Sequence, residues 1–165
     1  ANAPEAKNWG YELEVRKKLD YSVWTDNFTV SANYTRIWSE VPFFDPTTRE
    51  ETVRTMHGQA PWTVNLGLMF ATDSGRTNVN LLFNKVGRRL NKIADFRFLY
   101  VYLEPRNKLD LVITQRFGSR YKLKAAVKDI LAEDTVLTSG TEANPYEYSR
   151  FTEGTEYSLS LSARF

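Results

Sequence analysis

The side chains that most often perform catalysis are sparse in this sequence. His57 is the only histidine among 165 residues, and a general base or a metal ligand needs partners that the sequence does not place beside it. Glu12 and Glu14 share one face of a predicted strand, as a pair of catalytic carboxylates would. Arg16 and Lys18 continue that face, however, so a charge-balanced wall is the better interpretation. Neither a glycine-rich phosphate loop nor a serine–histidine–aspartate set is present. We therefore predict no catalytic residue, no metal site, no cofactor and no enzymatic activity.

Aromatic side chains in the predicted connections are the stronger candidates for contacts with a ligand. They could form a cradle for a small molecule, or they could only pack the connections against one another, and the sequence favours neither interpretation. The lone histidine lies in the same kind of segment and joins the candidate set. The candidate ligand contacts are Phe43, Phe44, His57, Tyr100, Tyr102, Tyr146 and Tyr148.

Composition and charge exclude several classes of protein. The net charge of +2 mixes both signs, and no basic stripe is interleaved with stacking aromatics, so we expect no nucleic-acid partner. The absence of cysteine rules out disulfides, cysteine-ligated metals and thiol nucleophiles. No run of eighteen or more apolar residues exists, which excludes a membrane-spanning helix. A transmembrane β-barrel passes that test because its apolar residues alternate with polar ones.

Alternation of apolar and polar residues predicts about seven strands. In the third strand, Trp62, Val64 and Leu66 oppose Thr63, Asn65 and Gly67. The charged face of the first strand must be in contact with water, whereas its other face is apolar. The predicted strands cover about residues 9–19, 28–38, 62–71, 78–84, 109–116, 121–128 and 154–165. The fold class that we expect is all-β, an antiparallel up-and-down meander of about seven strands belonging to a larger transmembrane β-barrel.

The connections between these strands alternate between short and long. In a meander, this alternation places every short turn at one end and every long loop at the other, as in outer-membrane barrels. Strands of roughly 9 to 11 residues also suit a tilted bilayer crossing, whereas sandwich strands are nearer 5 or 6. Aromatic residues favour both strand ends, which suits interfacial belts but also suits any β-rich core. They are Trp9, Trp38 and Trp62 at the loop end, and Tyr21, Trp24, Phe28, Phe70, Phe117, Tyr121 and Phe165 at the turn end.

The last strand ends on an aromatic residue. Its apolar face carries Tyr157, Leu159, Leu161, Ala163 and Phe165, and serines and an arginine occupy the other face. This strand resembles the closing strand of bacterial outer-membrane barrels. In that family, the terminal phenylalanine and its alternate partners are the signal for the barrel-assembly machinery. The resemblance therefore implies that these five residues form a barrel-assembly signal.

Four further stretches occur in the same order as similar stretches in the C-terminal third of TonB-dependent receptors. They are GYELEV at 10–15, GQAPWTVNLG at 58–67, EPRNKLDL at 104–111 and LKAAVKDIL at 123–131. One departure is Asp129-Ile130-Leu131-Ala132, where the family often has an asparagine, a leucine and an aromatic residue. Members of this family are plugged, 22-stranded barrels that import siderophores, cobalamin or glycans with energy delivered by TonB.

The resemblance implies that residues 1–165 are a C-terminal barrel segment that lacks the plug and the earlier strands. Its expected partners are outer-membrane lipid, the barrel-assembly machinery, a small-molecule ligand and TonB through the absent N-terminal region. The expected location is the bacterial outer membrane. Two alternatives remain open. The chain could belong to another outer-membrane barrel, such as a porin or adhesin, or it could be a soluble β-sandwich that binds a partner through its loops.

Overall fold

The computed structural model describes residues 5–22, 25–45, 49–93, 100–140 and 143–164. Within these ranges the chain is all-β, and its strand pairs are antiparallel, which confirms the predicted all-β antiparallel meander. None of the described segments is a helix long and apolar enough to cross a membrane.

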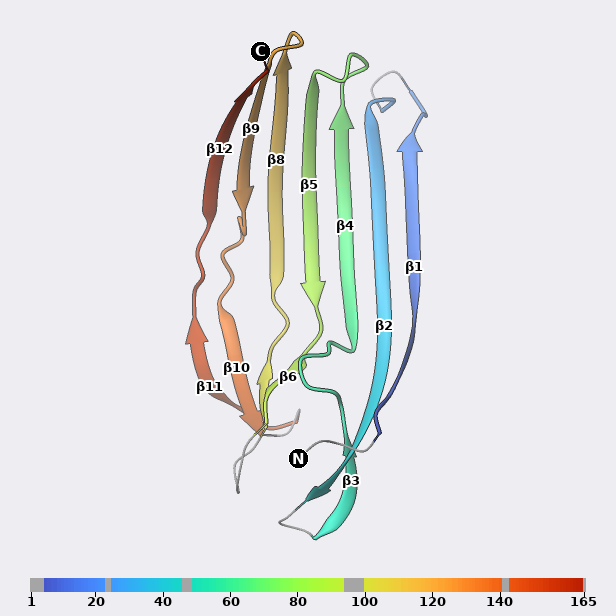
Figure 1. The fold of residues 1–165 in the computed structure, drawn as a ribbon, viewed down its shortest axis with the longest axis vertical. Helices are drawn as coiled ribbons and strands as arrows, with labels where there is room; N and C mark the ends of the chain where they lie inside the picture. The colour runs from blue at the N-terminus through green and yellow to red at the C-terminus, as the bar shows by residue number, and fades with distance from the viewer. Residues whose placement is uncertain (1–4, 23–24, 46–48, 94–99, 141–142, 165) are drawn as a thin grey trace.

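Seven long strands form one sheet, which we call the long sheet, in the order in which they occur along the chain (Figure 1). Each strand is antiparallel to the next, so the two edge strands β1 and β12 run in the same direction. The strands are β1 (Lys7–Leu19), β2 (Phe28–Asp45), β4 (Trp62–Ala71), β5 (Thr77–Val86), β8 (Asn107–Phe117), β9 (Tyr121–Lys128) and β12 (Glu156–Ala163). The short strand β3 (Glu50–Arg54) pairs only with the far end of β2. All seven predicted strands are therefore present.

The turn between β4 and β5 is tight because its sequence satisfies its own backbone. The Thr72 hydroxyl accepts a hydrogen bond from the Thr77 N–H at 3.1 Å, and the Gly75 N–H donates to the Thr72 carbonyl at 2.7 Å. Gly75 has a φ of +63°, a conformation that glycine adopts without steric cost. The hairpin fixes the β4–β5 register, which positions the polar site described below.

A second sheet, which we call the small sheet, lies in the long connections. Its order is β11, β10, β7, β6. The strands are β6 (Arg89–Lys92), β7 (Val101–Leu103), β10 (Thr135–Gly140) and β11 (Pro145–Phe151). No sequence pattern predicted these strands. They are short, and register shifts at Leu90/Lys92 and Leu137/Thr138 interrupt the alternation that would identify them.

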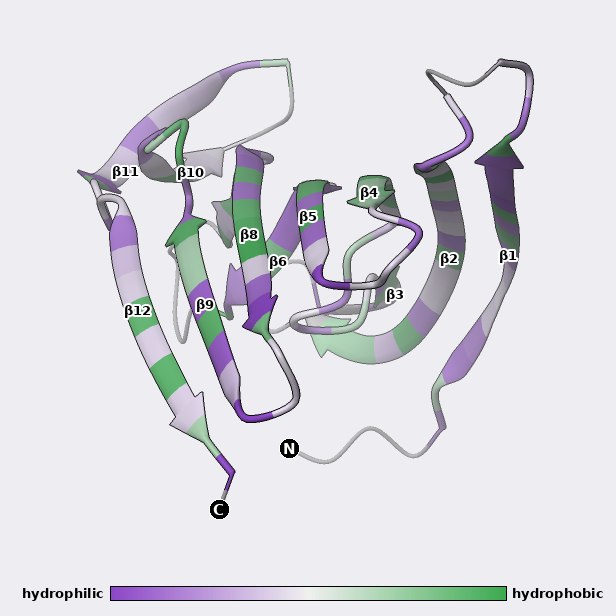
Figure 2. Cartoon of the chain, turned by 90° about the horizontal axis from the view of Figure 1, so that it is seen from above, coloured by the Kyte–Doolittle hydropathy of each residue, from purple (hydrophilic) through white to green (hydrophobic). Residues whose placement is uncertain are grey.

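The register of the long sheet aligns apolar residues across all seven strands. One such row runs along neighbouring pairing positions through Leu19, Phe28, Phe70, Val79, Ile113, Ala125 and Leu159. Because side chains alternate along each strand, the apolar rows share one face and most polar rows share the other. Figure 2 shows this alternation as bands of hydrophobic and hydrophilic residues along β9 and β12.

Apart from Ala126 of β9, the buried side chains of the described residues gather at the loop end and not beneath the long sheet. Leu90 is 2% exposed, and Val101 and Ser139 are similarly buried inside the small sheet. On the apolar face of the long sheet, by contrast, Val15 is 64% exposed and Leu161 is 70% exposed. The described residues therefore leave the apolar face of the long sheet largely uncovered.

Candidate functional site

Three asparagines on adjacent strands form a hydrogen-bonded row on the polar face, which we call the asparagine row. Asn33 of β2 lies opposite Asn65 of β4, which lies opposite Asn84 of β5. The Asn84 Nδ2 donates to the Asn65 Oδ1 at 2.7 Å, and the Asn65 Nδ2 donates to the Asn33 Oδ1 at 3.3 Å. The Asn33 amide donates in turn to the Glu12 carboxylate. Since an amide has two donors and two acceptor sites, Asn65 and Asn84 keep capacity for further partners.

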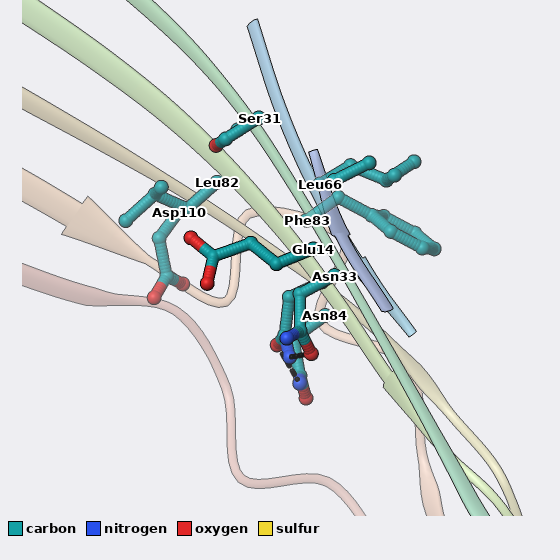
Figure 3. Close-up of a pocket in the computed structure, with 11 residues that line it drawn as sticks. Glu14, Ser31, Asn33, Leu66, Leu82, Phe83, Asn84 and Asp110 are labelled. Atoms are coloured by element: carbon teal, nitrogen blue, oxygen red, sulfur yellow. Dashed lines mark hydrogen bonds between the residues drawn. The ribbon is translucent and has the colours of Figure 1, made fainter. Parts of the chain in front are cut away.

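The asparagine row lines a hollow of about 310 Å³ on the polar face (Figure 3). Ser31 and Leu82 lie in the next polar row, and Glu14 and Asp110 stand at the two ends of the hollow. Three strands separate β1 from β8, yet Glu14 of β1 and Asp110 of β8 line the same hollow. The long sheet therefore curves around its polar face.

Gly67 occupies the middle of this hollow, between Ser31 and Leu82 in the register. A Cβ at this position would lie 2.4 Å from the Ser31 Oγ, so a larger residue would displace that hydroxyl. Leu82 is 46% exposed and is an apolar side chain on an otherwise polar wall. In Figure 3, Leu66 and Phe83 extend to the opposite side of the sheet from Leu82. The hollow thus combines amides, carboxylates, one hydroxyl and one apolar side chain.

The candidate contacts at the loop end divide into separate places. The Phe43 and Tyr100 rings meet edge to face with centroids 6.3 Å apart, and the Arg54 guanidinium lies 5.5 Å from the Phe43 ring centroid. Phe44, the next residue of β2, is 61% exposed. Tyr146 and Tyr148 lie on β11 and are about half exposed. Within the described residues, only Phe43 and Tyr100 of the predicted set pair ring to ring.

Two other candidates have structural partners. The His57 Nε2 donates to the Asn91 carbonyl oxygen at 2.7 Å, which ties the connection after β3 to β6. The Arg88 guanidinium lies 4.0 Å from the Tyr102 ring centroid, and its Nε donates to the Glu104 Oε1 at 2.8 Å. These contacts hold the small sheet together. Whether any of the seven candidates touches a ligand stays a prediction.

An ionic network joins the two sheets around Arg106. Its guanidinium bonds the Asp129 carboxylate at 2.8 Å and the Glu153 carboxylate at 2.7 Å. Burial raises the pKa of Glu153, but the attraction of Lys108 and Arg106 outweighs it, and the net pKa lies below its ordinary value. The Asn107 side-chain amide and backbone N–H both donate to the Glu133 carboxylate at 2.7 Å, which lowers the pKa of Glu133. Both carboxylates therefore favour the ionised state.

The proposed assembly signal lies on an edge strand. Tyr157, Leu159, Leu161 and Ala163 alternate along β12, and each pairs with β9 on one side only. Tyr157 is 76% exposed and Leu159 is 74% exposed. Phe165 lies outside the described residues. The edge position leaves the strand accessible, and its role as a signal stays a prediction.

The residues of the hollow were not predicted as a site. The sequence placed Asn33, Asn65 and Asn84 on polar faces of separate strands, but it did not specify which residues lie opposite one another. The only signal in the sequence is that three predicted strands each carry an asparagine at a polar position. The described part of the chain holds no cluster of histidine and carboxylate side chains suited to a metal ion.

Comparisons with protein-family models, curated proteins and solved structures found no match.

Proposed function

We propose that this chain forms part of the wall of a bacterial outer-membrane transport receptor. In this proposal the apolar face of the long sheet meets lipid, and the polar face lines a water-filled or plugged lumen. The assignment to TonB-dependent receptors rests on the order of the four sequence stretches and on the closing strand. The barrel would take up a small-molecule ligand with energy supplied through TonB.

The single observation that carries this proposal is the direction of curvature. The long sheet curves around its polar face, which leaves the apolar face convex and exposed. A soluble barrel or sandwich has the opposite arrangement, because it must bury its apolar face in a core. An outward apolar face and a polar interior are the arrangement of a barrel whose surrounding solvent is lipid.

Aromatic side chains at the two ends of the apolar face support the same orientation. Near the loop end, Tyr11 packs against Trp38 with ring centroids 5.9 Å apart, and at the turn end Phe28 packs against Phe70 at 5.1 Å. Along β4, Trp62 and Phe70 are eight residues apart. That separation is about 27 Å along the strand and about 20 Å across a bilayer at a tilt of about 40°, close to the apolar band of known barrels. Two belt candidates, Trp24 and Phe165, lie outside the described residues.

The two alternative functions differ in how well they fit the structure. A soluble sandwich needs a second sheet over the apolar face, and the described strands provide none there. A porin or adhesin would share the wall geometry, so only the resemblance favours a receptor over these proteins. The membrane orientation and the TonB dependence are therefore tested by separate experiments.

Single-cysteine labelling tests the membrane orientation directly, because the chain has no cysteine of its own. We expect Leu66→Cys and Leu68→Cys to resist a water-soluble maleimide when the protein is in lipid vesicles. Asn80→Cys, on the polar face, should react, and all three should react in denaturant. Equal labelling of both faces in vesicles would contradict the lipid-facing assignment.

The receptor assignment can be tested in cells that produce the protein containing this chain. Ligand uptake should be lost when TonB is deleted, while the amount of protein in the outer membrane stays unchanged. Uptake that is independent of TonB would favour a porin.

A further inference from the structure

We propose that the turn end of the polar face binds an acidic, extended segment of another protein. Basic residues gather there on β8, on β9, in the turn between them and just after β12. They are Arg116, Arg120, Lys122, Lys124 and Arg164, which we call the basic strip. The proposal goes beyond the uptake function above, because it concerns a protein partner and a part of the polar face away from the hollow.

The register of the long sheet brings the basic strip together. Arg116 of β8 lies directly opposite Lys122 of β9, and Lys124 follows Lys122 on the same face. The Arg164 N–H donates to the Arg120 carbonyl at 2.9 Å, so the pairing of β9 with β12 continues into the turn. In Figure 1 this turn and the end of β12 lie at the same end of the sheet. The basic strip therefore runs from the polar face to the rim, where a second protein has access to it.

The charges of the basic strip are not neutralised within the described residues. All of its side chains are exposed, and none takes part in an ion pair with another described residue. The described carboxylates at this end, Asp20, Asp26 and Asp73, lie in the β1–β2 and β4–β5 connections. Like charges directly opposite one another in a sheet are destabilising. The Arg116–Lys122 pair therefore carries a cost that an anionic partner would offset.

The polar face as a whole is divided by charge. Its turn-end half is basic on both edges, since Arg16 and Lys18 of β1 lie at that end too. The carboxylates that β1, β8 and β12 place on this face all lie in the loop-end half, and they are Glu12, Glu14, Asp110 and Glu156. The lysines of that half, Lys108 and Lys128, pair with Glu153 and Glu156. An acidic segment is therefore attracted by the turn-end half and repelled by the loop-end half.

The spacing of the cations matches an extended polypeptide. Lys122 and Lys124 are about 7 Å apart along β9, which is also the spacing of alternate side chains in an extended peptide. Ser162 and Ser160 lie opposite these two lysines on β12, so each cation has a hydroxyl donor beside it. A peptide with a carboxylate at every second residue would meet a cation and a hydroxyl at each step.

Other anions fit the basic strip less well. The nearest aromatic residues, Phe117 and Tyr121, pair with each other on the apolar face. The polar face therefore lacks the aromatic stacking platform that single-stranded nucleic acids use. A small anion is usually held in a concave site, and the hollow of the polar face is lined by other residues. An extended acidic peptide is the anion that this open strip suits.

Fluorescence anisotropy with a dye-labelled peptide of alternating glutamate and serine tests the proposal. We expect saturable binding to the detergent-solubilised protein that contains this chain, with weaker binding as salt is raised. Lys122→Gln/Lys124→Gln should weaken binding about fivefold or more, the effect of losing two exposed ion pairs. Lys108→Gln/Lys128→Gln is the matched control, since it removes the same charge from the polar face at residues that are already paired. The control should change binding less than about twofold.

Three outcomes of this assay would overturn the inference. They are no binding of the acidic peptide, equal weakening by the two double substitutions, and tighter binding of inorganic polyphosphate or single-stranded DNA than of the peptide. A melting curve for each variant separates loss of fold from loss of the site. The assay uses neither lipid vesicles nor TonB, so its failure would leave the receptor assignment to be judged by its own tests.

A photo-crosslinking amino acid in place of Ser119, in the β8–β9 turn, tests the source of the segment in cells. We expect an adduct with a second polypeptide, in which the cross-linked peptide is acidic. Lys122→Gln/Lys124→Gln should reduce the yield of this adduct, whereas Lys108→Gln/Lys128→Gln should not. An adduct formed only within the same polypeptide, or only with peptides that are not acidic, would overturn the assignment to another protein.

Discussion

The small sheet and the long sheet are built from the same chain but are stabilised in different ways. The small sheet buries Leu90 and Ser139 almost completely, at 2% and 1% exposure. The long sheet leaves Val15 and Leu159 at 64% and 74% exposure. The small sheet thus holds a core of its own, as a protein in water does. In the proposed function, the lipid of the membrane covers the outer face of the long sheet.

The polar groups of the two sheets also differ in how far they are buried. Beside β6 and β7, Arg88 and Glu104 bond to one another and to Thr138 of β10 in a partly buried cluster. In the long sheet, the asparagine row lies along an open hollow. Polar groups in the small sheet therefore serve packing, whereas those of the long sheet remain available to a ligand.

The largest expected effect is cavity formation in the small sheet. Leu90→Ala should lower the free energy of unfolding by about 2 to 5 kcal/mol, because it leaves a void in a close-packed region. The same substitution at Leu159, on the exposed edge strand, should cost much less. Denaturant titration of both variants measures the difference. Equal losses would show that the two sheets do not differ in packing.

A charge on the apolar face should have the next largest effect. Leu66→Arg lies midway between the aromatic belts and should cost about 2 to 4 kcal/mol in a bilayer. Asn80→Arg, on the polar face, should be nearly neutral. Refolding titrations into lipid vesicles compare the two variants. A similar cost at Asn80 would remove the distinction between the faces.

Acid should weaken the contacts between the two sheets, with a smaller effect on stability than either substitution above. The pKa values of Glu133 and Glu153 are lowered in the folded protein from the ordinary 4.5. Their contribution to stability is therefore present above about pH 4.5 and is lost as the pH falls through the lower folded values. Protease cleavage at the junction, between β9 and β10 or between β11 and β12, should rise below pH 4.5 and stay constant from pH 5 to 7. In Glu133→Gln this pH dependence should be weaker, and an unchanged profile would exclude Glu133 as a cause.

The smallest effect is expected at an exposed ion pair. Arg150 bonds Glu147 at 2.7 Å and Asp134 at 3.1 Å, but its side chain is 49% exposed. Arg150→Ala should leave the midpoint of thermal unfolding almost unchanged, because water and salt screen such pairs. Thermal melts at low and high salt measure it. A clear drop in the melting midpoint at both salt concentrations would mean that β11 contributes to the core more than its exposure indicates.

Sequence patterns predicted the long sheet well because its strands alternate over many residues. The strands expected at 62–71 and 121–128 have the bounds of β4 and β9. The small sheet escaped prediction because strands such as Val101–Leu103 are too short to establish a period. The hollow was not predicted from the sequence for a different reason. Asn65 and Asn84 become neighbours only through the register of the β4–β5 hairpin, and Glu14 and Asp110 converge only because the sheet curves.

The shared direction of β1 and β12 constrains how the sheet can be completed. A closed ring in which every neighbouring pair is antiparallel must contain an even number of strands, and the described residues contribute seven to the long sheet. If its own edges met, the seam would be parallel. Two copies with the same orientation in one membrane would have two parallel seams. Closure by antiparallel pairing alone therefore requires an odd number of strands from another segment, so strand parity disfavours a ring made only from copies of this chain in one orientation.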